Sequence, residues 1–264
     1  MSFAFHQPAT SPEAVALLGS IADSTPLAGG MTLLPTIKQR LATPAALIDL
    51  SKIASLSSIA IEADALVIGA MARHVDVAES GIVQSAIPML ARLAAGIGDP
   101  AVRNRGTIGG SVANNDPSAD YPAAVLGLGA TIVTDRRAIK AADFFTGLFE
   151  TALQPGEVIT QVRFPVPMAA GYAKFKSPAS RYALVGACVV KSASGISVAV
   201  TGAGPGVFRV SEMEAALAAS FTPAAVAAIK VSADNMSSDI HADAEYRAHL
   251  ITVMAKKAVA MAIG

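Results

Sequence analysis

The sequence predicts an α+β protein in two parts. Residues 1–165 alternate short apolar runs with helical patterns, whereas the residues beyond 167 read as strands followed by helices. Pro165 and Pro167, followed by Met-Ala-Ala-Gly, separate the two patterns. Apolar residues make up 53% of the 264 residues, which is enough to bury a sizeable core. We therefore expect one domain over 1–166 and a smaller one over 167–264.

Local signals define the elements of the first part. Ser11 as N-cap, with Pro12 at the first helical position, starts a helix that runs to Leu18. The pattern then predicts a helix at 31–40, limited by Pro35, a strand at 47–50, a hairpin of 58–62 with 65–69, a helix at 85–97, and strands at 130–134 and 159–164.

The second part reads as an antiparallel sheet followed by helices. Apolar runs predict strands at 172–175, 183–191 and 196–200, with the last two joined by a turn at 192–195. Helices follow at 211–219, at 222–230 with Thr222 as N-cap, and from Asp243 almost to the end. Strands followed by helices indicate a small α+β domain.

Charge and hydropathy exclude two classes of partner. Twenty Lys+Arg balance twenty Asp+Glu, so no basic surface for nucleic acid is expected. The longest uncharged stretches are broken by Gly, Pro or Ser, so we expect no membrane span. The start, MSFAFHQP, has no signal-peptide pattern, and we expect a cytoplasmic protein.

Cysteine and histidine usage argues against a metal centre. Cys188 is the only cysteine, so the chain cannot form a disulfide or hold an iron–sulfur cluster by itself. The four histidines form no ligand pair and are expected to be ordinary surface or capping residues. No nucleophile elbow, P-loop or Rossmann fingerprint is present, and Gly202-Ala-Gly-Pro-Gly reads as a turn. Any redox centre must therefore be a bound cofactor or belong to a partner.

Two glycine-rich segments are the candidate ligand sites. Leu27-Ala-Gly-Gly-Met-Thr-Leu-Leu-Pro lies between a strand-like run and a helix, where bare backbone can approach an anion. Alone, it is more typical of a plain strand–turn–helix connection than of a ligand site.

The second segment, residues 98–122, is dense in Gly, Asn, Asp and Arg and too irregular for one helix or strand. Within it, Thr107, Gly109, Gly110 and Ser111 offer successive backbone donors and hydroxyls, the pattern of an anion nest. Asp120 is placed to N-cap a helix from Tyr121. Two such segments about 80 residues apart suit a diphosphate held between two lobes.

These segments resemble a known family. AGG-Met-Thr-Leu-Leu-Pro with Lys38, and VRNRGTIGGSVANNDPSADYPAA, are similar to the FAD-binding medium subunit of molybdenum hydroxylases, of the carbon monoxide dehydrogenase and xanthine dehydrogenase type. The resemblance continues through Tyr172-Ala-Lys-Phe-Lys and into the terminal helix, so it covers nearly the whole chain. It implies a two-lobed FAD-binding domain of the vanillyl-alcohol-oxidase (PCMH) type and a small C-terminal α+β domain.

The resemblance also implies a set of cofactor-binding residues. Residues 28–32 and 107–111 would hold the diphosphate and ribityl chain, Asp120 would bond toward the sugar–ribityl region, and Ile159 would pack by the adenine or the flavin. Lys176, or alternatively Lys174, would lie near the isoalloxazine, with Tyr182 against the ring. The full set is Ala28, Gly29, Gly30, Met31, Thr32, Leu33, Thr107, Ile108, Gly109, Gly110, Ser111, Asn115, Asp116, Asp120, Ile159, Lys174, Lys176 and Tyr182. The family usually has Gln or His, then Ser, after the two glycines, where Met31 and Thr32 stand here.

By this resemblance the chain relays electrons and is incomplete alone. FAD would be its own cofactor, while a large partner would carry the molybdenum cofactor and a small partner the [2Fe-2S] clusters. No catalytic acid or base for substrate is assigned in this chain. The alternatives are a self-sufficient FAD oxidase or reductase of the same fold, and a non-catalytic scaffold without flavin.

Overall fold

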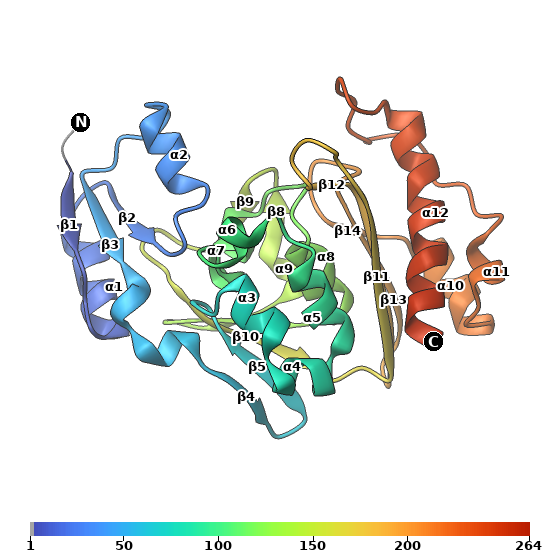
Figure 1. Cartoon of the computed structure of the whole chain (residues 1–264), viewed down its shortest axis with the longest axis horizontal. Helices are drawn as coiled ribbons and strands as arrows, with labels where there is room; N and C mark the ends of the chain where they lie inside the picture. Colours follow the sequence, from blue (N-terminus) through green and yellow to red (C-terminus); the bar gives the residue numbers. More distant parts are fainter. Residues whose placement is uncertain (1–2) are drawn as a thin grey trace.

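The computed structural model describes residues 3–264 and begins with a small parallel α/β lobe (Figure 1). Its sheet has the order β1-β3-β2 and is parallel throughout. Apolar residues of α1 pack on it, with Ala14 and Leu18 against Ile48. The lobe consists of β1 (Ala4–His6), α1 (Ser11–Ser20), β2 (Ser24–Leu27), α2 (Leu33–Lys38) and β3 (Ala46–Asp49), followed by the 3-10 turns Leu50–Lys52 and Ala54–Ser57.

The second lobe is a five-stranded antiparallel sheet with helices packed on one face (Figure 1). The strand order is β4-β5-β10-β6-β7, so β10 returns from late in the chain to the centre. The strands are β4 (Ile59–Glu62), β5 (Ala65–Gly69), β6 (Thr131–Thr134), β7 (Ala138–Lys140) and β10 (Ile159–Pro165), with a separate hairpin of β8 (Phe145–Gly147) and β9 (Glu150–Thr151). The helices are α3 (His74–Glu79), α4 (Gly81–Ala86), α5 (Pro88–Ala95), α6 (Pro100–Arg103), α7 (Ile108–Asn114), α8 (Tyr121–Gly127) and α9 (Ala141–Phe144).

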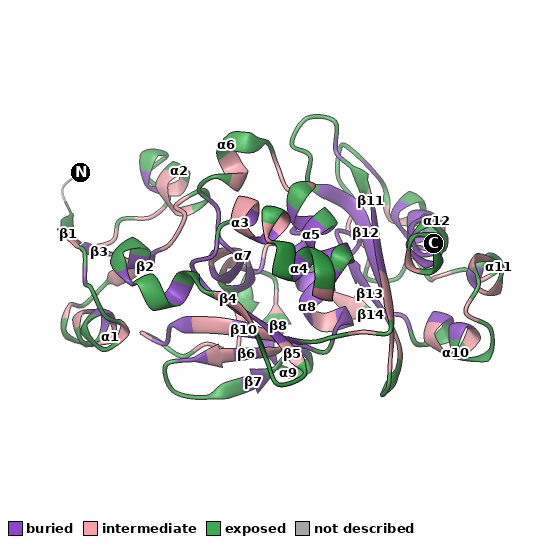
Figure 2. Cartoon of the chain, turned by 60° about the horizontal axis from the view of Figure 1, so that its bottom comes forward, coloured by how far each residue is buried: buried purple, intermediate pink, exposed green. Residues whose placement is uncertain are grey.

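The remaining residues form an antiparallel sheet that is buried on both faces (Figure 2). On β12, Cys188 and Val190 join the core of the second lobe, while Ala187 and Val189 pack with α12. The sheet therefore lies between α8 and α12. Its elements are β11 (Ala169–Lys176), β12 (Ala183–Ser192), β13 (Gly195–Thr201) and β14 (Phe208–Arg209), followed by α10 (Ser211–Ala219), α11 (Pro223–Val226) and α12 (Ala244–Ile263).

Three helices differ from the sequence expectation at their ends. Thr10, not Ser11, is the N-cap of α1, because its extended backbone lets the hydroxyl accept from the Glu13 amide. The expected helix over 85–97 is broken at Ile87, and α5 starts at Pro88, whose missing N–H is harmless at a first helical position. The expected helix over 31–40 starts only at Leu33, because Gly30 has a φ of +73°. It ends at Lys38, shortly before Arg40, whose backbone is left-handed.

Tertiary contacts shorten a fourth helix. The expected helix over 222–230 ends at Val226. The carbonyl of Ile229 accepts a hydrogen bond from Thr252 of α12 at 2.7 Å, which holds the following residues against that helix instead.

The long polar segment 98–120 is not one irregular loop. It contains α6 and α7, with the glycines of the Thr-Ile-Gly-Gly motif in the first turn of α7. The Thr107 hydroxyl caps this helix by accepting from the Gly110 amide at 3.1 Å. The motif therefore presents a helix start to its surroundings.

Candidate functional site

A cavity of about 510 Å³ lies between the two lobes of the first domain and reaches the loop between β11 and β12 of the second domain. This volume is in the range of sites for small organic ligands. It is lined by residues 28–33, by Gly109, Gly110 and Ser111 of α7, by Asp116, Ala119 and Asp120 after it, by residues 157–159, and by residues 180–182, among others. Both glycine-rich segments found in the sequence therefore border one cavity.

Glycines allow the two segments to touch. A Cβ on Gly29 would overlap the carbonyl oxygen of Arg105 and lie 2.7 Å from the Cα of Gly106. On α7 itself, a Cβ on Gly109 would lie 2.5 Å from the Cβ of Ala70, so this helix also packs closely against the end of β5. No side chain tolerates contacts this short, so these positions require glycine for close packing of backbone on backbone.

The first glycine segment carries free backbone donors. Within residues 3–264, the amides of Gly29, Gly30, Met31, Thr32 and Leu33 have no hydrogen-bond partner. All five residues line the cavity. Unpaired amides at a turn leading into a helix favour a negatively charged ligand group.

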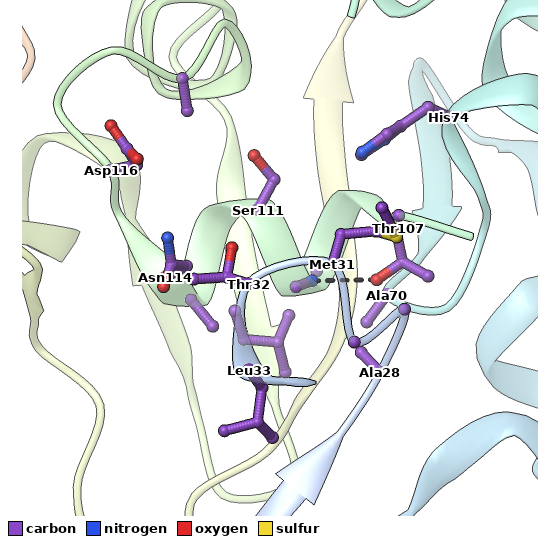
Figure 3. Close-up of a pocket in the computed structure, with 18 of the residues that line it drawn as sticks. Ala28, Met31, Thr32, Leu33, Ala70, His74, Thr107, Ser111, Asn114 and Asp116 are labelled. Carbon is purple, nitrogen blue, oxygen red and sulfur yellow. Dashed lines mark hydrogen bonds between the residues drawn. The ribbon is translucent and has the colours of Figure 1, made fainter. Parts of the chain in front are cut away.

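The second segment does not form the expected anion nest. The amide of Ile108 donates to Ala72 O at 3.0 Å, that of Gly109 to Ala70 O at 2.8 Å, and that of Gly110 to the Thr107 hydroxyl. The Ser111 amide closes the first turn on Thr107 O. These donors are used inside the protein, so the segment offers the bare backbone of Gly110 and the Ser111 hydroxyl instead (Figure 3).

Asp120 precedes α8 but does not cap it. Its side chain makes no bond to the helix start, because two partners from β11 hold it. The Tyr172 hydroxyl donates to Oδ1 at 2.5 Å, and Lys174 Nζ donates to Oδ2 at 2.8 Å. Burial raises the pKa of Asp120, and the nearby Lys174 ammonium opposes that effect. Asp120, which lines the cavity, is thus held in place by two residues of β11.

Four of the residues implied by the resemblance do not line the cavity: Ile108, Asn115, Lys174 and Lys176. Ile108 is fully buried in the core, and Lys176 is exposed. Asn115 is buried with a φ of +44°, and its amide nitrogen donates to Gly147 O and Glu150 O, which fixes the β8–β9 hairpin. Lys174 acts on a lining residue, Asp120, rather than on the cavity. The other implied residues all line it.

His74 was not expected at the site. It is only 5% exposed, in contrast to the surface or capping role expected for the histidines, and it lines the cavity (Figure 3). Its Nδ1 is buried without a partner in the described chain. Burial, aided by the charge of Arg103, lowers the pKa of His74 to about 4, so the ring is neutral at pH 7. No spacing to another polar residue marks it in the sequence.

Glu157 is a second lining residue that the sequence did not indicate. Its carboxylate accepts from Arg137 Nε at 2.9 Å, from the Thr134 hydroxyl at 2.8 Å and from the Gln154 amide at 2.8 Å. The bonds from Arg137 are the main cause that lowers the pKa of Glu157 to about 2. The charged carboxylate therefore holds the lining residue Glu157 in place.

The described residues contain no group of three or more His, Cys, Asp or Glu side chains arranged to hold a metal ion. No helix in residues 3–264 is long and apolar enough to cross a bilayer. Cys188 is buried, and burial raises the pKa of its thiol to about 12.

Comparison with known proteins assigns the chain to a family. Residues 1–167 match the FAD binding domain in molybdopterin dehydrogenase, and residues 170–262 match the CO dehydrogenase flavoprotein C-terminal domain. The carbon monoxide dehydrogenase medium chain of Hydrogenophaga pseudoflava is 38% identical over 97% of this chain and 96% of its own. The nicotine 6-hydroxylase medium subunit of Paenarthrobacter nicotinovorans is 35% identical over 97% and 95%.

Solved structures agree with the sequence comparison. A chain of reconstituted CO dehydrogenase from Oligotropha carboxidovorans superposes with a TM-score of 0.92 at 34% identity, covering 99% of this chain and 98% of that one. These matches confirm the fold expected from the sequence, an FAD-binding domain followed by an α+β C-terminal domain. The chain belongs to the family of FAD-binding medium subunits of molybdenum hydroxylases.

Proposed function

We propose that this chain holds one FAD non-covalently in the cavity between its lobes and relays electrons through it. The electrons would come from [2Fe-2S] clusters on a small partner subunit and leave to an external acceptor. A large partner subunit with the molybdenum cofactor would oxidise the substrate. When bound, FAD supplies the redox chemistry, and the protein supplies placement and electrostatics.

The observation that carries the proposal is that residues 29–33 line the cavity and that their amides have no hydrogen-bond partner within residues 3–264. Such donors need a partner, and a diphosphate supplies charged oxygen acceptors. Thr32, Ser111 and Asp120 line the same space, and their hydroxyl and carboxylate groups would suit the hydroxyls of a ribityl chain. Met31 lines the cavity and contributes no polar group at a position where the family usually has one.

We assign the two ends of the cofactor on the same basis. Ile159, beside the fixed Glu157, offers an apolar contact for the adenine or the flavin. Tyr182 lines the cavity while 44% exposed, which suits packing against a ring near the surface. Of the two lysines, Lys174 would act through Asp120, and Lys176 remains a proposed neighbour of the isoalloxazine.

The partner subunits are part of this proposal. The relatives' names, medium chain and medium subunit, imply other subunits in those complexes. Cys188 as the only cysteine supports the division of labour, because a cluster needs several thiolates. The same names specify carbon monoxide in one relative and nicotine in another, so the substrate would be selected by the large partner.

Two further assignments are also proposals. We place the domain boundary between residues 166 and 167, supported by the break between β10, which ends at Pro165, and β11, which starts at Ala169. We also propose the cytoplasm as the compartment in which the chain works.

Purification with and without the neighbouring subunit genes tests the proposal. We expect the chain to copurify with a large and a small subunit, and denaturation to release free FAD in equal amount to the chain. A complex without flavin would support the scaffold alternative. Flavin that stays attached after denaturation would contradict non-covalent binding.

A further inference from the structure

The segment 116–120 connects α7 to α8 and forms one wall of the cavity. Asp116, Ala119 and Asp120 line the cavity directly. The segment has little regular structure of its own, apart from a turn in which Asp116 accepts from the amides of Ser118 and Ala119. Its conformation must therefore be fixed from outside.

The second domain supplies that fixation through β13 and β12. Thr201 is fully buried at the end of β13, and its hydroxyl lies 2.9 Å from Pro117 O and 2.7 Å from Ala119 O. The Gly202 amide donates to Pro117 O at 2.7 Å, and the Ala183 amide donates to Ser118 O at 3.3 Å. Buried carbonyl groups are costly when unpaired, so these bonds select one position for the segment.

The β11 strand holds the other end of the segment. Tyr172 and Lys174 bind the two oxygens of the Asp120 carboxylate. Lys174 Nζ also donates to Gly96 O at 3.1 Å, just before the cavity-lining residues Ile97 and Gly98. One ammonium group thus joins two walls of the cavity to the second domain.

We propose that strands β11–β13 clamp the wall of the FAD cavity, with Thr201 as a positioning residue that sets FAD affinity without touching the cofactor. The inference rests on FAD being the ligand of this cavity. A wall that is ordered before binding spares the complex the conformational entropy of ordering it. Loosening the clamp should therefore weaken FAD binding while the fold persists.

Thr201→Val tests this with little change in side-chain volume. It removes the hydroxyl that both Pro117 and Ala119 use. We expect FAD to bind the apo form of the full chain about tenfold more weakly, equivalent to losing roughly one net hydrogen bond. Thr201→Ser keeps the hydroxyl and should restore affinity to within about twofold of wild type.

Thr252→Val is the matched control. Thr252 also donates its hydroxyl to a backbone carbonyl, Ile229 O at 2.7 Å, but it lies on α12 away from the wall. We expect it to lower the urea midpoint of the apo protein as Thr201→Val does, with unchanged FAD affinity. Hydrogen exchange of the apo proteins should be faster at residues 116–120 in Thr201→Val only.

The outcomes separate the clamp from the proposed function. If wild type binds FAD and Thr201→Val binds it equally well, the clamp is refuted while the proposed function stands. The same holds if Thr252→Val weakens FAD binding as much, because the effect would then be one of general stability. If the wild-type chain does not bind FAD, the proposed function fails and the clamp fails with it.

Discussion

Lys174 of β11 and Asp120 at the start of α8 form a buried ion pair, with Nζ and Oδ2 2.8 Å apart and side chains 8% and 4% exposed. Lys174 lies on a strand of the C-terminal sheet and Asp120 directly precedes a helix of the second lobe, 54 residues earlier in the chain. Because Asp120 lines the cavity and Lys174 does not, the pair carries the influence of the second domain into the proposed FAD site.

Lys174→Met should strongly destabilise the protein at neutral pH. The buried Asp120 carboxylate would keep only the Tyr172 hydroxyl, and removing one partner of a buried pair costs about 3–5 kcal/mol of unfolding free energy. Urea denaturation at pH 7 measures this loss. The exposed Lys176→Met is the control and should change the free energy by less than about 0.5 kcal/mol.

The loss of unfolding free energy caused by Lys174→Met should be smaller at acid pH than at neutral pH. Burial raises the pKa of Asp120, so the folded state takes up a proton at a higher pH than the unfolded chain does. Without the lysine, falling pH therefore removes the unpaired charge and restores stability. An equal loss at pH 5 and pH 7 would show that Asp120 is not the group left unpaired.

Gly110→Val should abolish FAD binding while the fold persists. A Cβ there would lie 2.9 Å from the Thr107 hydroxyl and 3.4 Å from the Cβ of Ala28, so the larger side chain would enter the gap between α7 and the first glycine segment. The backbone of Gly110 is not left-handed, so the effect would come from space rather than from strain. Flavin content measures FAD binding, and far-ultraviolet circular dichroism shows whether the fold persists.

Gly19→Val provides the control for that substitution. Gly19 lies exposed on α1, and nothing lies within 4 Å of an added Cβ. This variant should retain its FAD. Normal flavin content in a folded Gly110→Val protein would remove α7 from the site.

His74→Gln should change the acid dependence of stability. Burial lowers the pKa of His74 to about 4, so the unfolded chain takes up the proton first as the pH falls. Between pH 6.5 and pH 4, the protonation of His74 should lower the free energy of unfolding of wild type by roughly 3 kcal/mol. The variant lacks this titrating group and should not show that part of the loss. Urea denaturation across that range compares them.

His249→Gln, on the exposed side of α12, should leave the profile of wild type unchanged. Identical profiles for wild type and His74→Gln would mean that His74 is accessible to protons in the folded state. The comparison therefore tests the burial of His74 at the cavity.

Local signals account for the elements that the sequence predicted well. The helix Ser211–Ala219 was expected with the observed ends, and Asp243 caps α12 by accepting from the Tyr246 amide at 2.7 Å. Pro88, by contrast, starts α5 inside a stretch that was expected to be one continuous helix, although a proline favours the first helical position. The composition of the sequence also indicated the two glycine-rich segments as ligand sites. The structure brings them into contact and places both of them at one cavity.

The errors at the site share one physical cause, which is long-range pairing. Asp120 has the position of a cap, but Tyr172 and Lys174, 52 and 54 residues away, take its carboxylate. The amides of Ile108 and Gly109 are used by Ala72 and Ala70, which come from a separate stretch of chain. His74 becomes a site residue only because folding buries it beside the cavity. None of these pairings has a signature in local sequence.

In the proposed relay, FAD in this chain receives its electrons from partner subunits. The most direct measurement follows the oxidised-flavin absorbance after mixing the FAD-loaded chain anaerobically with carbon monoxide, an aldehyde or a purine, first alone and then with the large and small subunits added. We predict no rapid bleaching with the chain alone and rapid bleaching with the complete complex and the substrate that its large subunit accepts. Rapid bleaching by a substrate with the chain alone would contradict the relay and indicate a self-sufficient oxidase.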